Sequence, residues 1–288
     1  MARETTNFGD LPDEHSALEN AEVVIIPVPY DGTSTWVKGA DKGPEAIIEA
    51  SANMELYDIE TDSEAYRKGI FTAQPIKPRS SAEDMVEAVR QKVQEHLQKG
   101  KFTVVIGGEH SISVGAVKAH VGQYGDMTVL QLDAHSDLRD EYEGSKYSHA
   151  CVMARIRELC PIVQVGIRSM DSSEKDVLDS SRVFFARDIV ESTSWVDEVV
   201  AKLSQKVYVT IDLDVFDPSV MPSTGTPEPG GLDWYGVLAL LRAVCDRRDV
   251  TGFDVAELCP GSRNKAPDFL AAKLIYKLLS YKFRGQHG

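Results

Sequence analysis

Cysteine is scarce in this sequence. Four cysteines occur among 288 residues, namely Cys151, Cys160, Cys245 and Cys259. No two of them form a CxxC pair, which excludes a zinc ribbon and a thioredoxin-like redox motif. Thiols spread this thinly are typical of an intracellular protein with reduced, mostly buried cysteines. A chain of this length buries enough apolar surface to fold without disulfides or metals, so any metal site here needs a functional explanation.

Basic residues are outnumbered by acidic ones. The chain has 31 Lys and Arg against 45 Asp and Glu, a formal net charge of −14 with His neutral. A field of that sign repels phosphate backbones and anionic membrane surfaces. We therefore expect neither a nucleic-acid partner nor a membrane partner, and the charge mildly favours a small cationic substrate.

Long apolar runs are missing from the start of the chain. The first twenty residues are acidic and polar and contain no apolar signal-peptide core. The strongest apolar run nearby, residues 23–28, is far too short to span a bilayer. These features predict a cytoplasmic protein.

The chain alternates short β-branched runs with longer amphipathic stretches, and no Pro/Ser-rich linker or repeat interrupts the pattern. The pattern predicts strands over residues 23–27, 102–106, 127–132, 162–165, 183–185, 207–213 and 250–255. It predicts helices over residues 44–57, 82–99, 148–159, 195–204, 232–245 and 267–279. Apolar strands separated by helices indicate an α/β fold with a parallel sheet covered on both faces. Ligands of such sheets bind at the carboxyl ends of the strands.

Three strand ends carry polar side chains that suit chemistry. The first is FTVVIGGEH, in which a Gly-Gly turn places His110 at the lip of the sheet. The second is LQLDAHSD, where Asp133, His135 and Asp137 share one face of an extended chain. The third is VYVTIDLDVFD, where Asp212 and Asp214 again share a face.

Each of these segments also has a structural interpretation. His110 alone suits a structural histidine after a glycine turn, and the DxHxD segment alone suits a solvated polar loop. An Asp after a strand often caps the next helix or turn, although capping explains one of Asp212 and Asp214 better than both.

Together the three segments favour a metal site. Two like charges about 4 Å apart repel by about 4 kcal/mol at an effective dielectric near 20. Four carboxylates that converge on one edge therefore need raised pKa values or cations between them. Two divalent ions match their charge, with the nitrogens of His110 and His135 completing the ligands. Oxygen and nitrogen donors without thiolate favour Mn²⁺ over structural zinc, and a water held between two such ions is a nucleophilic hydroxide near neutral pH.

The motifs GGEH, DAHSD, IDLDVFDP and STGTPEPGG resemble those of the ureohydrolases, the arginase and agmatinase family. The resemblance runs from about residue 27 to Glu257, with the motifs in the family's order. It implies a three-layer α/β/α sandwich with a central, mainly parallel sheet, formed as one domain over residues 1–288. It also implies two Mn²⁺ ions per subunit, hydrolysis of a guanidinium to urea and an amine by a metal-bridging hydroxide, and a homotrimer or homohexamer.

The resemblance assigns a role to each matching residue. One ion is expected on His110, Asp133, Asp137 and Asp212, and the other on Asp133, His135, Asp212 and Asp214. Asp137 is expected to transfer the proton of the nucleophile. His149 matches the family's proton-shuttling histidine, and Glu257 matches the carboxylate that pairs with the substrate guanidinium. Taken alone, His149 also suits a helix start and Glu257 an ordinary surface charge.

The sequence of the substrate loop, DLRDEYEGSKYSHA, followed by GTPEPGG, looks most like that of the agmatinases. The resemblance therefore implies agmatine as substrate, with putrescine and urea as products. Guanidinobutyrate, guanidinopropionate and arginine stay open as substrates. So do two other classes, a catalytically silent polyamine-binding protein and a single-zinc amidohydrolase of similar fold.

Overall fold

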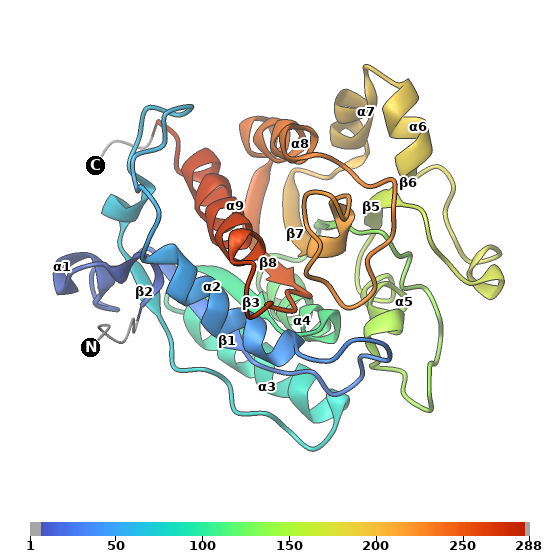
Figure 1. Ribbon diagram of the computed structural model, residues 1–288, viewed down its shortest axis with the longest axis horizontal. Coiled ribbons are helices and arrows are strands. Elements are labelled where there is room, and N and C mark those ends of the chain that lie inside the picture. Colours follow the sequence, from blue (N-terminus) through green and yellow to red (C-terminus); the bar gives the residue numbers. More distant parts are fainter. Residues whose placement is uncertain (1–6, 286–288) are drawn as a thin grey trace.

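A computed structural model describes residues 7–285 of the chain. Within them eight strands form one sheet in the order β2-β1-β3-β8-β7-β4-β5-β6, and every neighbouring pair is parallel (Figure 1). The strands are β1 Val23–Val28, β2 Ile70–Thr72, β3 Phe102–Gly107, β4 Thr128–Leu132, β5 Ile162–Ile167, β6 Val183–Phe185, β7 Lys206–Asp212 and β8 Asp249–Ala256.

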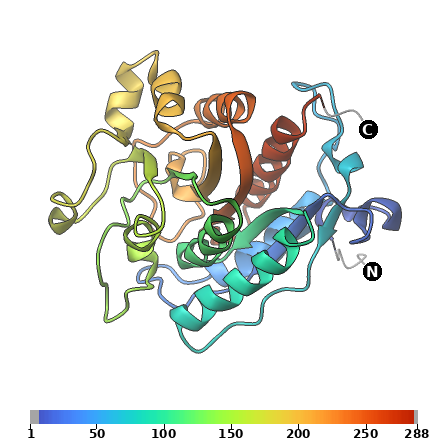
Figure 2. The ribbon, with the colours of Figure 1, turned by 180° about the vertical axis from the view of Figure 1, so that it is seen from behind.

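Helices cover both faces of the sheet (Figures 1 and 2). One layer contains α2 Gly43–Ser51, α7 Trp195–Lys202, α8 Trp234–Arg247 and α9 Ala266–Lys282. The other contains α3 Ala82–Leu97, α4 Ser113–Tyr124 and α5 Val152–Ile156. The short helices α1 Asp13–Ser16 and α6 Ala186–Glu191 lie beside the edge strands β2 and β6.

Side-chain alternation along β1 divides the core between these layers. Val23 and Ile25 belong to the cluster under α2, α8 and α9, whereas Val24 and Ile26 belong to the cluster under α3 and α4. All four are buried, since a central parallel strand is covered on both faces. The predicted three-layer α/β/α fold is confirmed, and its sheet is parallel throughout the described residues.

Four elements were not predicted from the sequence, and two predicted helices are shorter than expected. The missed elements are α1, β2, α4 and α6. The helix expected over residues 44–57 ends at Ser51, and in the one expected over 148–159 only Val152–Ile156 is α-helical. Helix α4 is rich in small and β-branched residues, and a Cβ on its Gly115 would lie 2.2 Å from the Val86 carbonyl oxygen of α3. Close packing on α3 therefore decides α4, where intrinsic propensity is weak.

The strand order brings separate parts of the chain to one edge of the sheet. The chain leaves β3 and enters β4 three positions along the sheet, and β7 and β8 later fill the gap. The four central strands β3, β8, β7 and β4 therefore end side by side. Reversals of this kind create the crevice in which α/β sheets bind ligands.

Candidate metal centre

A glycine turn delivers His110 from β3. Gly108 lies so close to Tyr30 that a Cβ would be 2.0 Å from its carbonyl oxygen, which explains the glycine. The N–H groups of Gly108 and Glu109 donate to the carbonyls of Val28 and Tyr30, both at 2.8 Å. His110 then begins a 3₁₀ turn and is buried.

The loop after β4 carries Asp133, His135 and Asp137. The His135 N–H donates to Asp133 Oδ1 at 2.6 Å, so the chain turns immediately after the strand. Asp137 has a φ of 52°, a backbone conformation that residues other than glycine rarely adopt. The expectation of one extended face is therefore wrong in its geometry, although the loop does bring all three side chains to the same edge. Backbone strain of this kind is frequent at functional sites.

The two aspartates after β7 are both placed by a local turn. Asp212 Oδ1 accepts from the Asp214 N–H at 2.9 Å and caps the 3₁₀ turn Leu213–Val215. Its second oxygen, Oδ2, lies 3.6 Å from His110 Nδ1. The capping interpretation of Asp212 is therefore confirmed for one oxygen, and the other oxygen stays available as a metal ligand.

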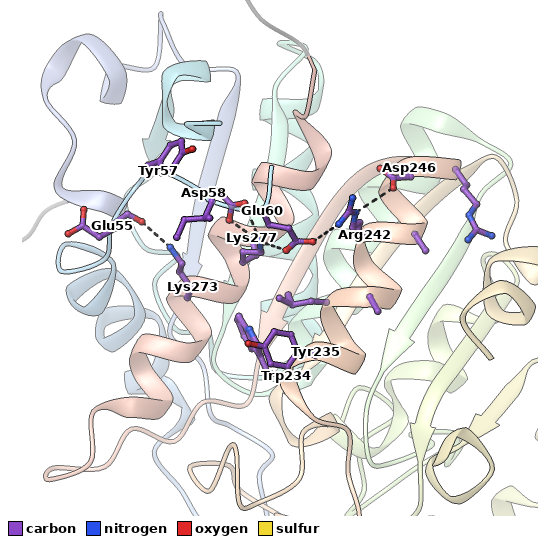
Figure 3. Close-up of a pocket in the computed structure, with 15 residues that line it drawn as sticks. Glu55, Tyr57, Asp58, Glu60, Trp234, Tyr235, Arg242, Asp246, Lys273 and Lys277 are labelled. Carbon is purple, nitrogen blue, oxygen red and sulfur yellow. Dashed lines mark hydrogen bonds and ion pairs between the residues drawn. The ribbon is translucent and has the colours of Figure 1, made fainter. Parts of the chain in front are cut away.

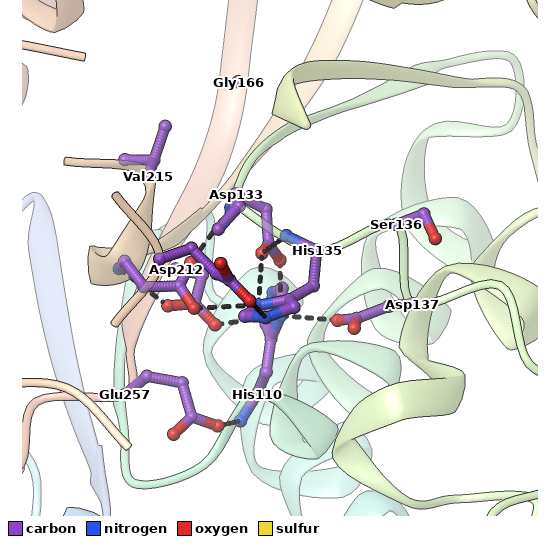
Figure 4. A network of polar contacts seen from close by, with 12 residues as sticks. His110, Asp133, His135, Ser136, Asp137, Gly166, Asp212, Val215 and Glu257 are labelled. Carbon is purple, nitrogen blue, oxygen red and sulfur yellow. Dashed lines mark hydrogen bonds and ion pairs between the residues drawn. The ribbon is translucent and has the colours of Figure 1, made fainter. Parts of the chain in front are cut away.

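The side chains from β3, β4 and β7 form two overlapping groups whose ligand atoms lie within 4.8 Å of one another (Figure 4). His110, Asp133 and Asp212 make the first, and Asp133, His135 and Asp214 make the second. In the first group, His110 Nδ1 lies 3.2 Å from Asp133 Oδ2 and also 3.1 Å from Asp137 Oδ2. In the second, His135 Nδ1 lies 2.9 Å from Asp214 Oδ2 and 3.7 Å from Asp133 Oδ1.

The position of Asp133 suits a shared ligand because this carboxylate belongs to both groups. Asp212 belongs to the first group alone, and Asp137 joins it through His110. All six residues expected to bind metal therefore lie together.

The electrostatics of the cluster show an excess of negative charge. Within residues 7–285, His110 and His135 are the ion-pair partners of these four carboxylates, and no Lys or Arg joins them. Burial, followed by the neighbouring carboxylates, raises the pKa of Asp212 well above its usual value and that of Asp137 to about 7. Asp137 and Asp212 thus resist ionisation because no cation lies beside them. Their oxygens and the neighbouring histidine nitrogens are ligand atoms that suit divalent metal ions.

Histidine protonation responds to the same charges. Burial by itself lowers the pKa of His110 and His135, but the surrounding aspartates raise the pKa of His110 well above normal and that of His135 to about 12. The remote nitrogen of His110, Nε2, lies 2.8 Å from Thr210 Oγ1, whose hydroxyl donates to buried Asp254 at 2.7 Å. Nε2 is therefore the donor, which leaves Nδ1 facing the carboxylates for a metal ion.

Glu257 lies directly after β8, beside the two overlapping acid–histidine groups, which are called the metal groups below. Its φ is 69°, and its Oε1 accepts from the His110 N–H at 2.7 Å. Burial, and then the charge of Glu109, raise its pKa well above the usual value. The interpretation as an ordinary surface charge is wrong, because Glu257 is buried.

A cavity of about 300 Å³ opens onto these groups. Six of the predicted site residues line it, namely His110, His135, Asp137, His149, Asp212 and Glu257. His149 begins a 3₁₀ turn, and burial, followed by repulsion from His135 and His110, lowers its pKa to about 4. Further out, Arg139 lies 3.6 Å from Asp171 and 4.7 Å from the Tyr142 ring centre, so its charge is already paired.

Sequence reasoning missed several residues that position the site. Glu174 accepts from the Leu138 N–H at 2.7 Å and so holds the loop that carries Asp137. Gln131 donates to Asp133 at 2.7 Å, and Glu109 binds the loop that contains Thr33. Glu109 and Gln131 were visible within GGEH and LQLDAHSD, and Thr33 lies in PVPYDGTST, where the resemblance begins. Glu174 stands far from the motifs in sequence, so no local pattern marks it.

Comparison with known proteins agrees with this arrangement. The model of the arginase family matches residues 21–280. The chain belongs to the arginase family. It is 41% identical to an N(1)-aminopropylagmatine ureohydrolase of Synechocystis sp. over 92% of this chain and 90% of the relative. It is also 34% identical to an agmatinase of Pyrococcus horikoshii, over 93% and 94% of the two chains.

Solved structures of the family share the fold. The agmatine ureohydrolase of Thermoplasma volcanium superposes with a TM-score of 0.89 at 31% identity, covering 100% of this chain and 98% of that one. Membership of the arginase family identifies the chain as a ureohydrolase and confirms the resemblance read from its motifs. Within the described residues, no helix has the length and apolarity to cross a membrane.

Proposed function

We propose that this ureohydrolase releases urea from a linear guanidinoalkylamine. The sequence predicted agmatine, with putrescine as the second product. N(1)-aminopropylagmatine is the stronger first candidate, because the 41% identical relative carries that name. Agmatine is the second, supported by the names of the Pyrococcus and Thermoplasma proteins. The observation that carries the proposal is a buried glutamate, Glu257, beside two overlapping acid–histidine groups.

The metal ligands are part of this proposal. One ion is assigned to His110, Asp133, Asp137 and Asp212, and the other to Asp133, His135, Asp212 and Asp214. We assign Mn²⁺ to both, because oxygen and nitrogen donors without thiolate suit it. When bound, two such ions supply Lewis acidity and a water molecule of lowered pKa.

Three residues of the chain then handle the substrate. The Glu257 carboxylate faces the cavity and can pair bidentately with a planar guanidinium. Asp137 lines the cavity beside His110 and is assigned to accept a proton and to release it to the departing amine. His149 lines the cavity and is assigned to exchange that proton with solvent.

The outer cavity favours a substrate tail that is cationic. Arg139 is not free to bind a substrate carboxylate, because Asp171 and the Tyr142 ring already contact its guanidinium. The nearby loop also carries Asp140, Glu141 and Glu143. An ammonium tail meets fewer like charges here than the carboxylate of a guanidino acid would, which supports the amine substrates over arginine, guanidinobutyrate and guanidinopropionate.

A substrate panel tests the proposal. Purified protein loaded with Mn²⁺ is assayed for urea with N(1)-aminopropylagmatine, agmatine, arginine, guanidinobutyrate and guanidinopropionate. We expect the highest kcat/KM with the first, followed by agmatine. Urea from arginine or a guanidino acid alone would overturn the substrate class. No urea from any compound would favour a silent polyamine-binding protein, and one bound zinc per chain would favour a single-metal amidohydrolase.

The remaining predictions concern organisation. We propose one ureohydrolase domain over residues 1–288, of which 1–6 and 286–288 lie outside the described residues. A homotrimer or homohexamer and a cytoplasmic location complete the proposal. Light scattering on the purified protein tests the oligomeric state, and cell fractionation tests the location.

A further inference from the structure

Glu109 is a buried carboxylate that none of the roles above uses. It directly precedes His110 and is 0% exposed. Its Oε2 accepts from the N–H groups of Thr33 at 2.5 Å and Ser34 at 3.0 Å. Its Oε1 accepts from the hydroxyls of Thr33 at 2.8 Å and Ser111 at 2.6 Å. Burial raises the pKa of Glu109, but the hydrogen bonds of Ser111 and Thr33 act against this and favour the ionised form. The four donors match the acceptor sites of an ionised carboxylate, so Glu109 is fully engaged by protein groups.

Thr33 connects this carboxylate to His149. A threonine hydroxyl has one proton, and an ionised carboxylate can only accept, so the proton of Thr33 points to Glu109. The lone pairs of Oγ1 remain to accept hydrogen bonds. One of them accepts from the backbone N–H of His149 at 2.9 Å.

The same hydroxyl constrains the His149 ring. Its Nδ1 lies 3.2 Å from Thr33 Oγ1. Because the Thr33 proton is committed to Glu109, this contact is a hydrogen bond only if Nδ1 carries the proton. In a neutral ring the lone pair is then on Nε2, which has no hydrogen-bond partner among residues 7–285, while the ring lines the cavity.

We propose that Glu109 and Thr33 are positioning residues that hold His149 in the Nδ1–H form and aim the Nε2 lone pair into the cavity. The functional part rests on the proposed role of His149. In that role, Nε2 accepts one proton from the cavity and releases it to solvent. While the ring is doubly protonated, Glu109 stabilises its charge through the Thr33 hydroxyl, as an orienting carboxylate does in other acid–base sites.

Thr33→Val tests this relay, because valine matches threonine in shape but lacks the hydroxyl. In metal-free protein with ¹⁵N-labelled histidine, we expect NMR shifts of the Nδ1–H form for the wild type and a shift toward Nε2–H in the variant. With Mn²⁺ and agmatine or N(1)-aminopropylagmatine, whichever gives more urea, we expect kcat to fall about tenfold, with KM and metal content unchanged. Thr33→Ser should restore both readouts. If the valine variant does not fold, Thr33→Ala removes the same hydroxyl.

Ser148→Ala is the matched control. Ser148 Oγ lies 3.3 Å from the same Nδ1 but makes no hydrogen bond to Glu109. We expect this variant to keep the tautomer and kcat of the wild type. Retention of Nδ1–H in Thr33→Val, or an equal loss of kcat in Ser148→Ala, would overturn the proposal. If wild-type protein releases no urea, the proposed function fails, whereas the tautomer measurement still decides the hydrogen-bond assignment.

Discussion

Two of the hollows in the described part of the chain, both lined by charged residues, balance their charges differently. The larger, of about 870 Å³, lies between α8, α9 and residues 55–60 (Figure 3). There Lys277 lies 2.9 Å from Asp58 and 2.6 Å from Glu60, and Arg242 lies 2.8 Å from Glu60. Both acidic groups, Asp58 and Glu60, therefore have a cationic side chain beside them.

The smaller hollow, of about 300 Å³, holds the metal groups and Glu257. Its buried carboxylates have histidines as their ion-pair partners within the described residues, and burial raises the pKa of Asp137, Asp212 and Glu257. Asp58 and Glu60 of the larger hollow are paired with cations of the chain, whereas the carboxylates of the smaller one lack a Lys or Arg partner. Uncompensated buried charge distinguishes the candidate metal site from the larger hollow, and cavity size does not.

The largest effect is expected from Asp133→Asn, because Asp133 belongs to both metal groups. Loss of its charge should weaken both metal sites and lower kcat/KM by more than about a hundredfold. Burial opposes the charge of Asp133, but His110 and His135 hold its pKa below the usual value. The melting temperature of metal-free protein should therefore fall, since a stabilising charge is removed. Calorimetric Mn²⁺ titration and thermal melting measure the two effects. Unchanged metal affinity would contradict the shared-ligand assignment. Asp212→Asn should weaken metal binding similarly.

Lys277→Met in the larger hollow should lower the stability of the fold and leave the activity unchanged. It leaves the buried Asp58 carboxylate without its nearest cation, which should cost about 3 kcal/mol of unfolding free energy. Urea release per folded molecule should stay unchanged, because the site lies elsewhere. Denaturant unfolding and the urea assay measure the two quantities. If the variant kept the stability of the wild type but lost activity, the larger hollow would have a functional role and the comparison would be wrong.

His149→Ala removes a cavity group that is not assigned to metal. We expect retained Mn²⁺ and a kcat lowered about a hundredfold, the usual contribution of an acid–base group. Metal analysis and steady-state kinetics test both. Wild-type turnover would remove its role. The loss should exceed that of Thr33→Val, since the valine variant keeps the ring.

Glu257→Gln should have the smallest of these effects. The amide keeps the shape of the side chain but loses the charge that pairs with a guanidinium. A buried hydrogen bond to a charged group contributes about 1.5–3 kcal/mol, so KM should rise about ten- to a hundredfold. Steady-state kinetics with each guanidinoalkylamine measures this. Unchanged KM with lowered metal content would instead assign Glu257 to the metal site.

Prediction succeeded where a local pattern carries the information. Seven of the eight strands were predicted from apolar β-branched runs. The bounds of β6 match those predicted, and the other six differ slightly at their ends. Helix α4 was missed because its stability comes from close contact at Gly115 with α3. The end of α2 at Ser51 was also missed, because the amphipathic pattern continues to Tyr57 although the chain turns away.

The sequence by itself determined the chemistry at this site: which strand ends carry ligand atoms, and that their charges require cations. Ligand type and spacing are local properties of GGEH, DAHSD and IDLDVFDP. The tertiary structure decided which groups meet, because residues distant in the chain become neighbours only when β3, β8, β7 and β4 align. For the same reason the contact of Glu109 with Thr33, 76 positions apart, and its extension to His149 depend on the folded chain.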